Sequence, residues 1–158
     1  MEHISPQAKT DHALMREIYR AYLDELSAIL GYTTNAIVLI PHFPTVAALF
    51  EEIADDEMHH FAALGTALRS HGISPAVDTR IRQVPVRLEG KSEMQIAAFA
   101  RSTAEEALAD EKSAGANYRR LAAWSRDAEI RRTLLDIAED EQRHTEALAA
   151  TLARLDRS

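Results

Sequence analysis

One twelve-residue pattern occurs twice in the chain, and its two copies lie 84 positions apart. Both copies read Ile-Ala-x-Asp-Glu-x-x-His-x-x-Ala-Leu, the first starting at Ile53 and the second at Ile137. Residues three positions apart lie on the same face of an α-helix, so the glutamate and the histidine of one copy can reach the same metal ion. The repeat therefore predicts two helices that each present a Glu-x-x-His pair, and hence two bound ions.

Four long stretches carry apolar residues at helical spacing, and the helix-breaking residues lie between these stretches. The expected helices cover about residues 7–39, 45–70, 92–124 and 127–155. Residues suited to helix capping stand at their starts: Thr45 for the second helix, Ser92 with Gln95 for the third, and Ser125 or Asp127 for the fourth. The chain is therefore predicted to be all-α.

Residues 71–91 separate the second and third expected helices, contain two prolines and two glycines, and show no sustained period. We expect a long connection there, with a short extended piece around residues 84–86. The other connections are short, so two antiparallel helical hairpins joined by one long crossover would pack as a four-helix bundle. An extended helical solenoid, the alternative, needs more than two repeats. By length, residues 1–158 are expected to form a single domain.

The composition limits which metal ligands are available and which classes of partner the chain can bind. The chain has no cysteine, which excludes disulfides, thiolate zinc sites and iron–sulfur clusters within these residues, so any metal must be held by nitrogen and oxygen. Its net charge of −7 argues against nucleic acid or an anionic membrane as the main partner. No segment has the run of about 18 apolar residues that spans a membrane, and we expect a cytoplasmic protein.

Each expected helix carries one glutamate on its apolar stripe, and these are Glu25, Glu57, Glu111 and Glu141. The first and third helices also repeat each other, because an Asp-Glu pair is followed seven positions later by a tyrosine, Tyr32 or Tyr118. The chain thus reads as a duplicated helical hairpin with four carboxylates directed at its core.

Carboxylates buried without partners cost several kcal/mol each, so positive charge must compensate them. Four carboxylates balance two divalent cations, and His60 and His144 supply one nitrogen to each. This ligand set predicts iron or manganese, whereas zinc is less expected in such an oxygen-rich dinuclear site.

Two further pairs of residues are expected to support these ligands. Asp56 and Asp140 are placed to hydrogen-bond the histidine of the opposite hairpin and fix its ring, although both could simply be solvated. Tyr32 and Tyr118 could do the same for carboxylates about two turns away along their own helices, or serve only as core aromatics.

One glutamate on each of two helices, with Glu-x-x-His on each of the other two, is the ligand set of ferritin-like di-iron and di-manganese proteins. Over about residues 12–155 the chain resembles the ferritin-like superfamily, and within it rubrerythrins and manganese catalases. The resemblance rests on the segment from Glu25 to Tyr32, on Glu57 to Gly65, and on Glu111-Lys112 with Tyr118. It implies that Glu57 and Glu141 bridge two ions, that Glu25 and Glu111 are terminal carboxylates, and that His60 and His144 are terminal imidazoles.

The chain departs from the classical rubrerythrin pattern in two places. Rubrerythrins carry a cysteine-ligated iron domain, and the chain has no cysteine. They also have an extra carboxylate one turn after the glutamate of the third helix, where this chain has Ala114. A rubrerythrin-type peroxidase activity is therefore not a direct expectation.

These features lead us to expect first a redox-active dinuclear metalloprotein, an oxidase, peroxidase or catalase acting on O2 or hydrogen peroxide. The first alternative is metal binding or iron sequestration without turnover. The second is a metal-free helical interaction module. A homodimer is expected from the helical faces that bundle packing leaves over.

Overall fold

The computed structural model describes residues 6–77 and 88–157. Within them the chain forms four helices and no strand: α1 (Pro6–Leu39), α2 (Pro44–Ser70), α3 (Glu93–Trp124) and α4 (Ala128–Leu155). The all-α prediction is confirmed. The expected extended piece around residues 84–86 falls outside the described residues.

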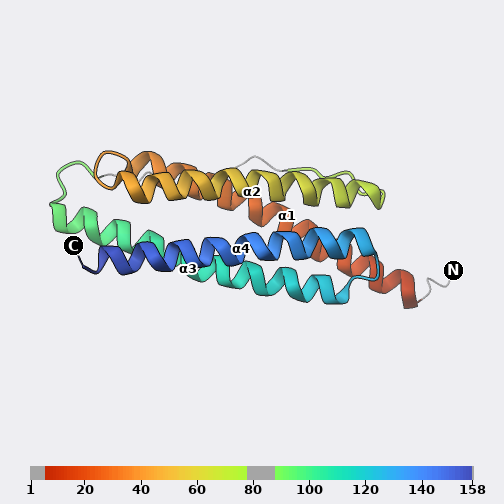
Figure 1. Cartoon of the computed structure of the whole chain (residues 1–158). Helices are drawn as coiled ribbons and strands as arrows, with labels where there is room; N and C mark the ends of the chain where they lie inside the picture. Colours follow the sequence, from red (N-terminus) through yellow and green to blue (C-terminus); the bar gives the residue numbers. More distant parts are fainter. Residues whose placement is uncertain (1–5, 78–87, 158) are drawn as a thin grey trace.

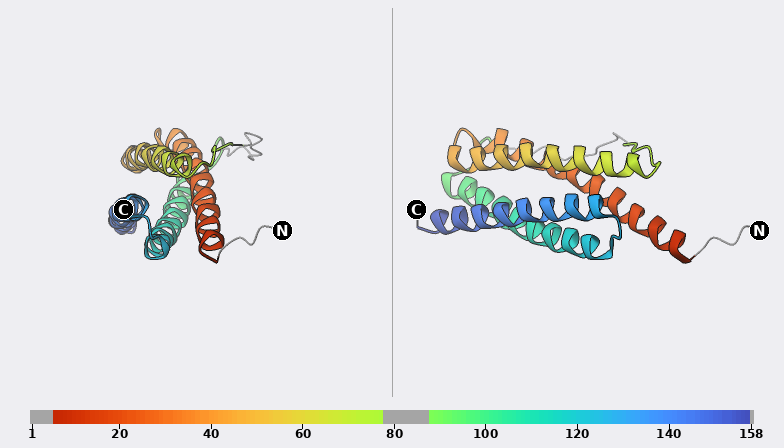
Figure 2. Two further views of the ribbon diagram at one scale, coloured as in Figure 1. Left: turned by 90° about the vertical axis from the view of Figure 1, so that its right-hand side faces the viewer. Right: turned by 45° about the vertical axis from the view of Figure 1, so that its right-hand side comes forward.

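The four helices pack as two hairpins (Figure 1). α1 packs along α2 and α3 along α4, whereas the two hairpins meet through α2 and α4 on one side and through α1 and α3 on the other. The N-terminal part of α1 slants towards the α3–α4 hairpin, as the two views in Figure 2 show. This arrangement is the predicted ferritin-like four-helix bundle.

The helix starts follow local chemistry, with one correction. The expected cap at Thr45 is wrong, because Phe43 is the N-cap of α2 and makes no side-chain cap bond. α2 instead begins with Pro44, whose fixed backbone angle suits the first turn and whose missing N–H group would have had no partner there.

The capping residues of α3 and α4 do satisfy the first backbone N–H groups of their helices. Ser92 and Gln95 form the expected reciprocal capping box. Of the two residues considered for α4, Asp127 is the cap, and its carboxylate accepts from the N–H groups of Glu129 and Ile130.

The apolar core is divided into two clusters along the bundle axis. One includes Ile18, Leu64, Leu121 and Leu134, and the other includes Leu39, Phe50, Ala104 and Leu148. On every helix the inward glutamate lies between the residues of the two clusters. The interior therefore contains a polar layer at mid-height, closed above and below by apolar packing. None of the four helices has an apolar stretch long enough to cross a membrane.

Candidate metal centre

The polar layer contains all six side chains that the sequence indicated as ligands. Each is between 1% and 4% exposed: Glu25, Glu57, His60, Glu111, Glu141 and His144. Burying so many ionisable groups without a cation would be costly, which is the physical argument for a bound metal at this level. Their role as ligands remains a prediction.

The six side chains form two overlapping groups, each with ligand atoms that lie within 4.8 Å of one another. The first group contains Glu25, Glu57, His60 and Glu141, and the second contains Glu57, Glu111, Glu141 and His144. Glu57 and Glu141 belong to both groups, which is the position that a carboxylate bridging two ions must take. Each group also has one histidine and one glutamate of its own.

Both imidazole rings face the site with Nδ1. Nδ1 of His60 lies 2.8 Å from Glu57 Oε2 and 3.5 Å from Glu141 Oε1. Nδ1 of His144 lies 3.1 Å from Glu111 Oε2 and 3.3 Å from Glu141 Oε2. The ring centroids are 6.1 Å apart, and each imidazole belongs to a different one of the two ligand groups.

The other ring nitrogen of each histidine contacts an aspartate of the opposite hairpin. Nε2 of His60 lies 3.0 Å from Asp140 Oδ2, and Nε2 of His144 lies 3.0 Å from Asp56 Oδ2. These are the contacts that the sequence led us to expect. An Nε2–H group that donates to the aspartate leaves the Nδ1 lone pair free for a metal and fixes the plane of the ring.

The two tyrosines also hydrogen-bond across the hairpins, which differs from the expected pairing within one helix. Tyr32 donates to Glu111, and Tyr118 donates to Glu25. Seven residues of helix span about 10 Å along the axis, too far for a phenol to reach the glutamate of its own helix. Across the antiparallel pair of α1 and α3, the tyrosine of one helix comes level with the glutamate of the other.

Three of the four glutamates hold protons more tightly than usual. Burial, followed by the neighbouring Glu57, raises the pKa of Glu25 to about 9. Burial also raises the pKa of Glu57 to about 7, and that of Glu141 to about 10, where the adjacent Glu111 adds to the effect. In the metal-free protein, bound protons thus neutralise part of the carboxylate charge that metal cations would otherwise balance.

Glu111 and His144 are the charged pair of this layer. Burial opposes both charges, but hydrogen bonds from His144, Glu141 and Tyr32 lower the pKa of Glu111. Burial likewise opposes the imidazolium, but hydrogen bonds to Glu111, Glu141 and Asp56 raise the pKa of His144 to about 11. In the metal-free site, the imidazolium of His144 and the carboxylate of Glu111 therefore stabilise each other.

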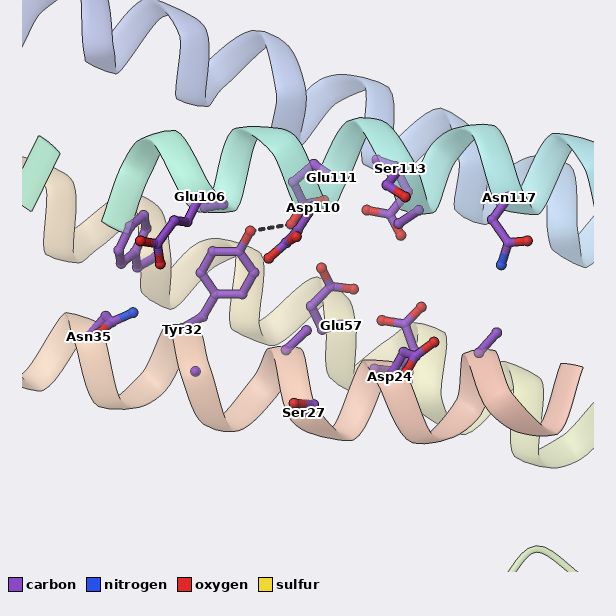
Figure 3. A pocket seen from close by; sticks show the side chains of 18 of the residues that line it. Asp24, Ser27, Tyr32, Asn35, Glu57, Glu106, Asp110, Glu111, Ser113 and Asn117 are labelled. Carbon is purple, nitrogen blue, oxygen red and sulfur yellow. Dashed lines mark hydrogen bonds between the residues drawn. The ribbon is translucent and has the colours of Figure 1, made fainter. Parts of the chain in front are cut away.

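A cleft of about 630 Å³ leads from solvent to the site between α1 and α3 (Figure 3). All four glutamates line it, and polar residues surround them: Asp24, Ser27, Asn35, Thr103, Glu106, Asp110, Ser113 and Asn117. Figure 3 shows Tyr32 reaching from α1 to Glu111 on α3, with Glu57 deeper in the cleft. Among residues 6–77 and 88–157, no lysine, arginine or histidine lines this opening, so the electrostatic potential of these residues favours cations and neutral molecules.

One residue that the sequence interpretation did not identify shapes the site from α3. A Cβ atom added at Gly115 would lie 3.2 Å from Cβ of Glu141, so the glycine allows α4 to approach closely beside a shared ligand. A lone glycine inside a helical stretch is the only signal in the sequence that points to such a contact. Gly31, which lines the same cleft, has no atom within 4 Å of an added Cβ.

Comparison with known proteins gives one positive result. No curated protein and no solved structure matches the chain. The family model for Rubrerythrin matches residues 18–152. This range contains all four inward glutamates and both Glu-x-x-His motifs, which end at His60 and His144. Together with the four-helix bundle, this match shows that the chain belongs to the rubrerythrin family, within the ferritin-like superfamily.

Proposed function

We propose that the protein binds two divalent transition-metal ions, iron or manganese, and uses them in a redox reaction with O2 or hydrogen peroxide. The observation that carries this proposal is the pair of overlapping, buried ligand groups that share Glu57 and Glu141. Imidazole and carboxylate ligands suit iron and manganese, while magnesium and calcium prefer oxygen alone. Zinc fits the ligand atoms but is less expected in a dinuclear site so rich in carboxylates.

Bound iron or manganese would supply one-electron redox steps and open coordination positions for a small oxidant. The protein's own residues prepare this site in three ways. Asp56 and Asp140 fix the histidine rings, and the tyrosines hold Glu25 and Glu111 in place. The cleft between α1 and α3 gives O2 or peroxide a path to the carboxylates. The apolar clusters on either side exclude bulk water from the rest of the layer.

Metal binding without turnover is the second function, and one observation favours it. The 158 residues contain no cysteine, so no thiolate-ligated iron centre within them can pass electrons to the site. This function predicts tight binding and strong stabilisation, but a negligible rate of O2 or peroxide consumption.

Elemental analysis of protein expressed with iron and manganese both available tests the proposal directly. We expect about two transition-metal ions per chain, and their loss in a Glu57→Ala or His144→Ala variant. Glu51→Gln, which changes an exposed carboxylate of α2, is the control and should keep both ions.

The same preparations separate the three functions. Oxygen-electrode and peroxide assays with the loaded protein would support the redox function if consumption depends on the metal. Bound metal without consumption would leave sequestration, and absence of stoichiometric metal would leave the helical interaction module. Light scattering on the loaded protein would test the expected homodimer.

A further inference from the structure

Arg143 on α4 stands on the side of the site formed by α2 and α4, away from the cleft. It directly precedes His144, and its side chain is 59% exposed. Its Nη2 atom donates a hydrogen bond to Oδ1 of Asp140 and lies 3.9 Å from Oδ2 of Asp56. One guanidinium group therefore contacts both of the aspartates that orient the histidines.

The contacts form a continuous network between the two ligand groups. Asp140 uses Oδ1 for Arg143 and Oδ2 for Nε2 of His60. The Asp56 oxygen beside Arg143 is the same atom that lies 3.0 Å from Nε2 of His144. The network thus runs from His60 through Asp140, Arg143 and Asp56 to His144, and joins the rings of both groups.

Electrostatics gives Arg143 a specific task in this network. Asp56 and Asp140 are both partly buried, with side chains 31–32% exposed, and both approach the same guanidinium nitrogen within 4 Å. Two carboxylates so close together repel each other, and a cation between them offsets this repulsion and helps to keep both at their histidines. An arginine is always protonated and offers donors in a planar fork, so its charge remains at any physiological pH.

The duplicated sequence supplies this cation only once. In the first copy of the repeat, the residue equivalent to Arg143 is His59, which is exposed on α2. His59 lies three residues after Asp56, just as Arg143 lies three residues after Asp140. An arginine at position 59 would therefore approach the same two aspartates from the other hairpin.

We propose that Arg143 is a positioning residue that holds Asp56 and Asp140 together, so that one surface arginine sets the metal affinity of both ligand groups. The proposal rests on the dinuclear site proposed above. It predicts that a single change at position 143 weakens both metal positions, although Arg143 acts on the two histidine ligands only through Asp56 and Asp140.

The test compares Arg143→Ala with Arg132→Ala in the full chain. Arg132 is the matched control, because it is an exposed arginine of α4 paired with an aspartate of its own helix, Asp136, at 3.9 Å. Calorimetric titration with Mn(II) should show two positions in the wild type and in Arg132→Ala. In Arg143→Ala we expect both affinities to fall by about 10- to 100-fold, the usual effect of losing a residue that supports a ligand.

A rescue variant separates the positioning role from a loss of folding. Adding His59→Arg to Arg143→Ala should restore both affinities to within a few-fold of the wild type. In the metal-free proteins, the ring ¹⁵N chemical shifts of His60 and His144 should both change in Arg143→Ala, return in the rescue variant, and stay unchanged in Arg132→Ala.

Unchanged Mn(II) affinities in Arg143→Ala would overturn the proposal, as would weakening of one position alone or a rescue variant as weak as the single variant. If the wild type itself binds no metal, the dinuclear function fails and this inference fails with it. If the wild type binds two ions and Arg143→Ala binds Mn(II) with the same affinities, the positioning role of Arg143 is wrong and the proposed dinuclear site still stands.

Discussion

The phenol of Tyr118 on α3 donates its hydrogen bond to Glu25 on α1, so that a residue of one hairpin holds a ligand of the other. Tyr32 and Glu111 form the reciprocal pair. The same exchange occurs between each histidine and the aspartate of the opposite hairpin. The two halves of the duplicated chain therefore orient each other's ligands on both sides of the site.

Tyr118→Phe should weaken the metal position that contains Glu25. The hydrogen bond from Tyr118 lowers the pKa of Glu25, so its loss makes the carboxyl group release its proton to a metal less readily. We expect Mn(II) affinity at neutral pH to fall by about tenfold, and the unfolding free energy of the metal-free protein to fall by about 1 kcal/mol. Tyr19→Phe, which removes a hydrogen bond to the carbonyl of Ala76 outside the site, should leave Mn(II) affinity unchanged.

Glu141→Gln should separate metal binding from folding. At neutral pH burial keeps Glu141 protonated in the metal-free protein, with a pKa of about 10, so a neutral amide replaces a neutral acid. We expect Tm of the metal-free protein to stay the same or rise. In the wild type, free Mn(II) at about 100 times its Kd should add about 2.7 kcal/mol of stability. An equal Mn(II)-induced rise in the Tm of Glu141→Gln would show that this carboxylate is not a ligand.

The stability of the metal-free protein should fall as pH rises. Glu25, Glu57 and Glu141 keep their protons in the folded state up to pKa values of about 9, 7 and 10, and His144 up to about 11, whereas the unfolded chain releases them near 4.5 and 6.5. The folded state thus binds more protons across this range, and raising the pH disfavours it. Glu111, whose pKa is lowered, contributes stability that is lost only in acid, as pH falls below 4.5.

Thermal unfolding at several pH values checks this prediction. Without metal, Tm should decrease steadily from about pH 6 to about pH 9. With saturating Mn(II), the rise in Tm over the metal-free protein should grow across the same range, because binding releases protons. If the Tm of the metal-free protein instead increases with pH, the raised pKa values of the buried glutamates and of His144 are contradicted.

Gly115→Ala and Gly31→Ala form a matched pair on α3 and α1. Alanine favours a helix interior over glycine by about 1 kcal/mol, so both variants gain the same local stability. At position 31 the added methyl meets open space, whereas at position 115 it lies 3.2 Å from Cβ of Glu141 and must displace it. Gly31→Ala should therefore unfold at higher denaturant concentration with unchanged Mn(II) affinity, and Gly115→Ala should lose affinity. Equal affinities in the two variants would show that the approach of α4 to α3 does not set the geometry at Glu141.

The fold and the ligand set follow from short-range patterns in the sequence. Helical periodicity and breakers located the four helices, and the three-residue spacing of Glu57 and His60 placed both side chains on one inner face. The cap of α2 was missed, because Thr45 suits an N-cap by type but Pro44 already fixes the first turn. Patterns within a helix identify its inward residues, but they do not give the register between helices.

The register between helices explains which contacts could not be predicted from the sequence. The partners of Tyr32 and Tyr118 depend on how far α1 is shifted along α3, which no spacing within either helix encodes. The role of Gly115 depends on the distance between α3 and α4 at one level. Both are properties of the packed bundle. The sequence therefore indicates which side chains face the core, but not which side chains of the other helices they contact.

Because the site lies at the junction of the two hairpins, we expect metal binding to occur late in folding. Contacts within a hairpin are close in sequence and form early, whereas contacts between hairpins must first close the crossover loop. Each ligand group takes three residues from one hairpin and the fourth from the other. A nascent chain with separate hairpins therefore offers an ion an incomplete set of ligands, and the rate of ion uptake by a refolding chain would measure the docking step.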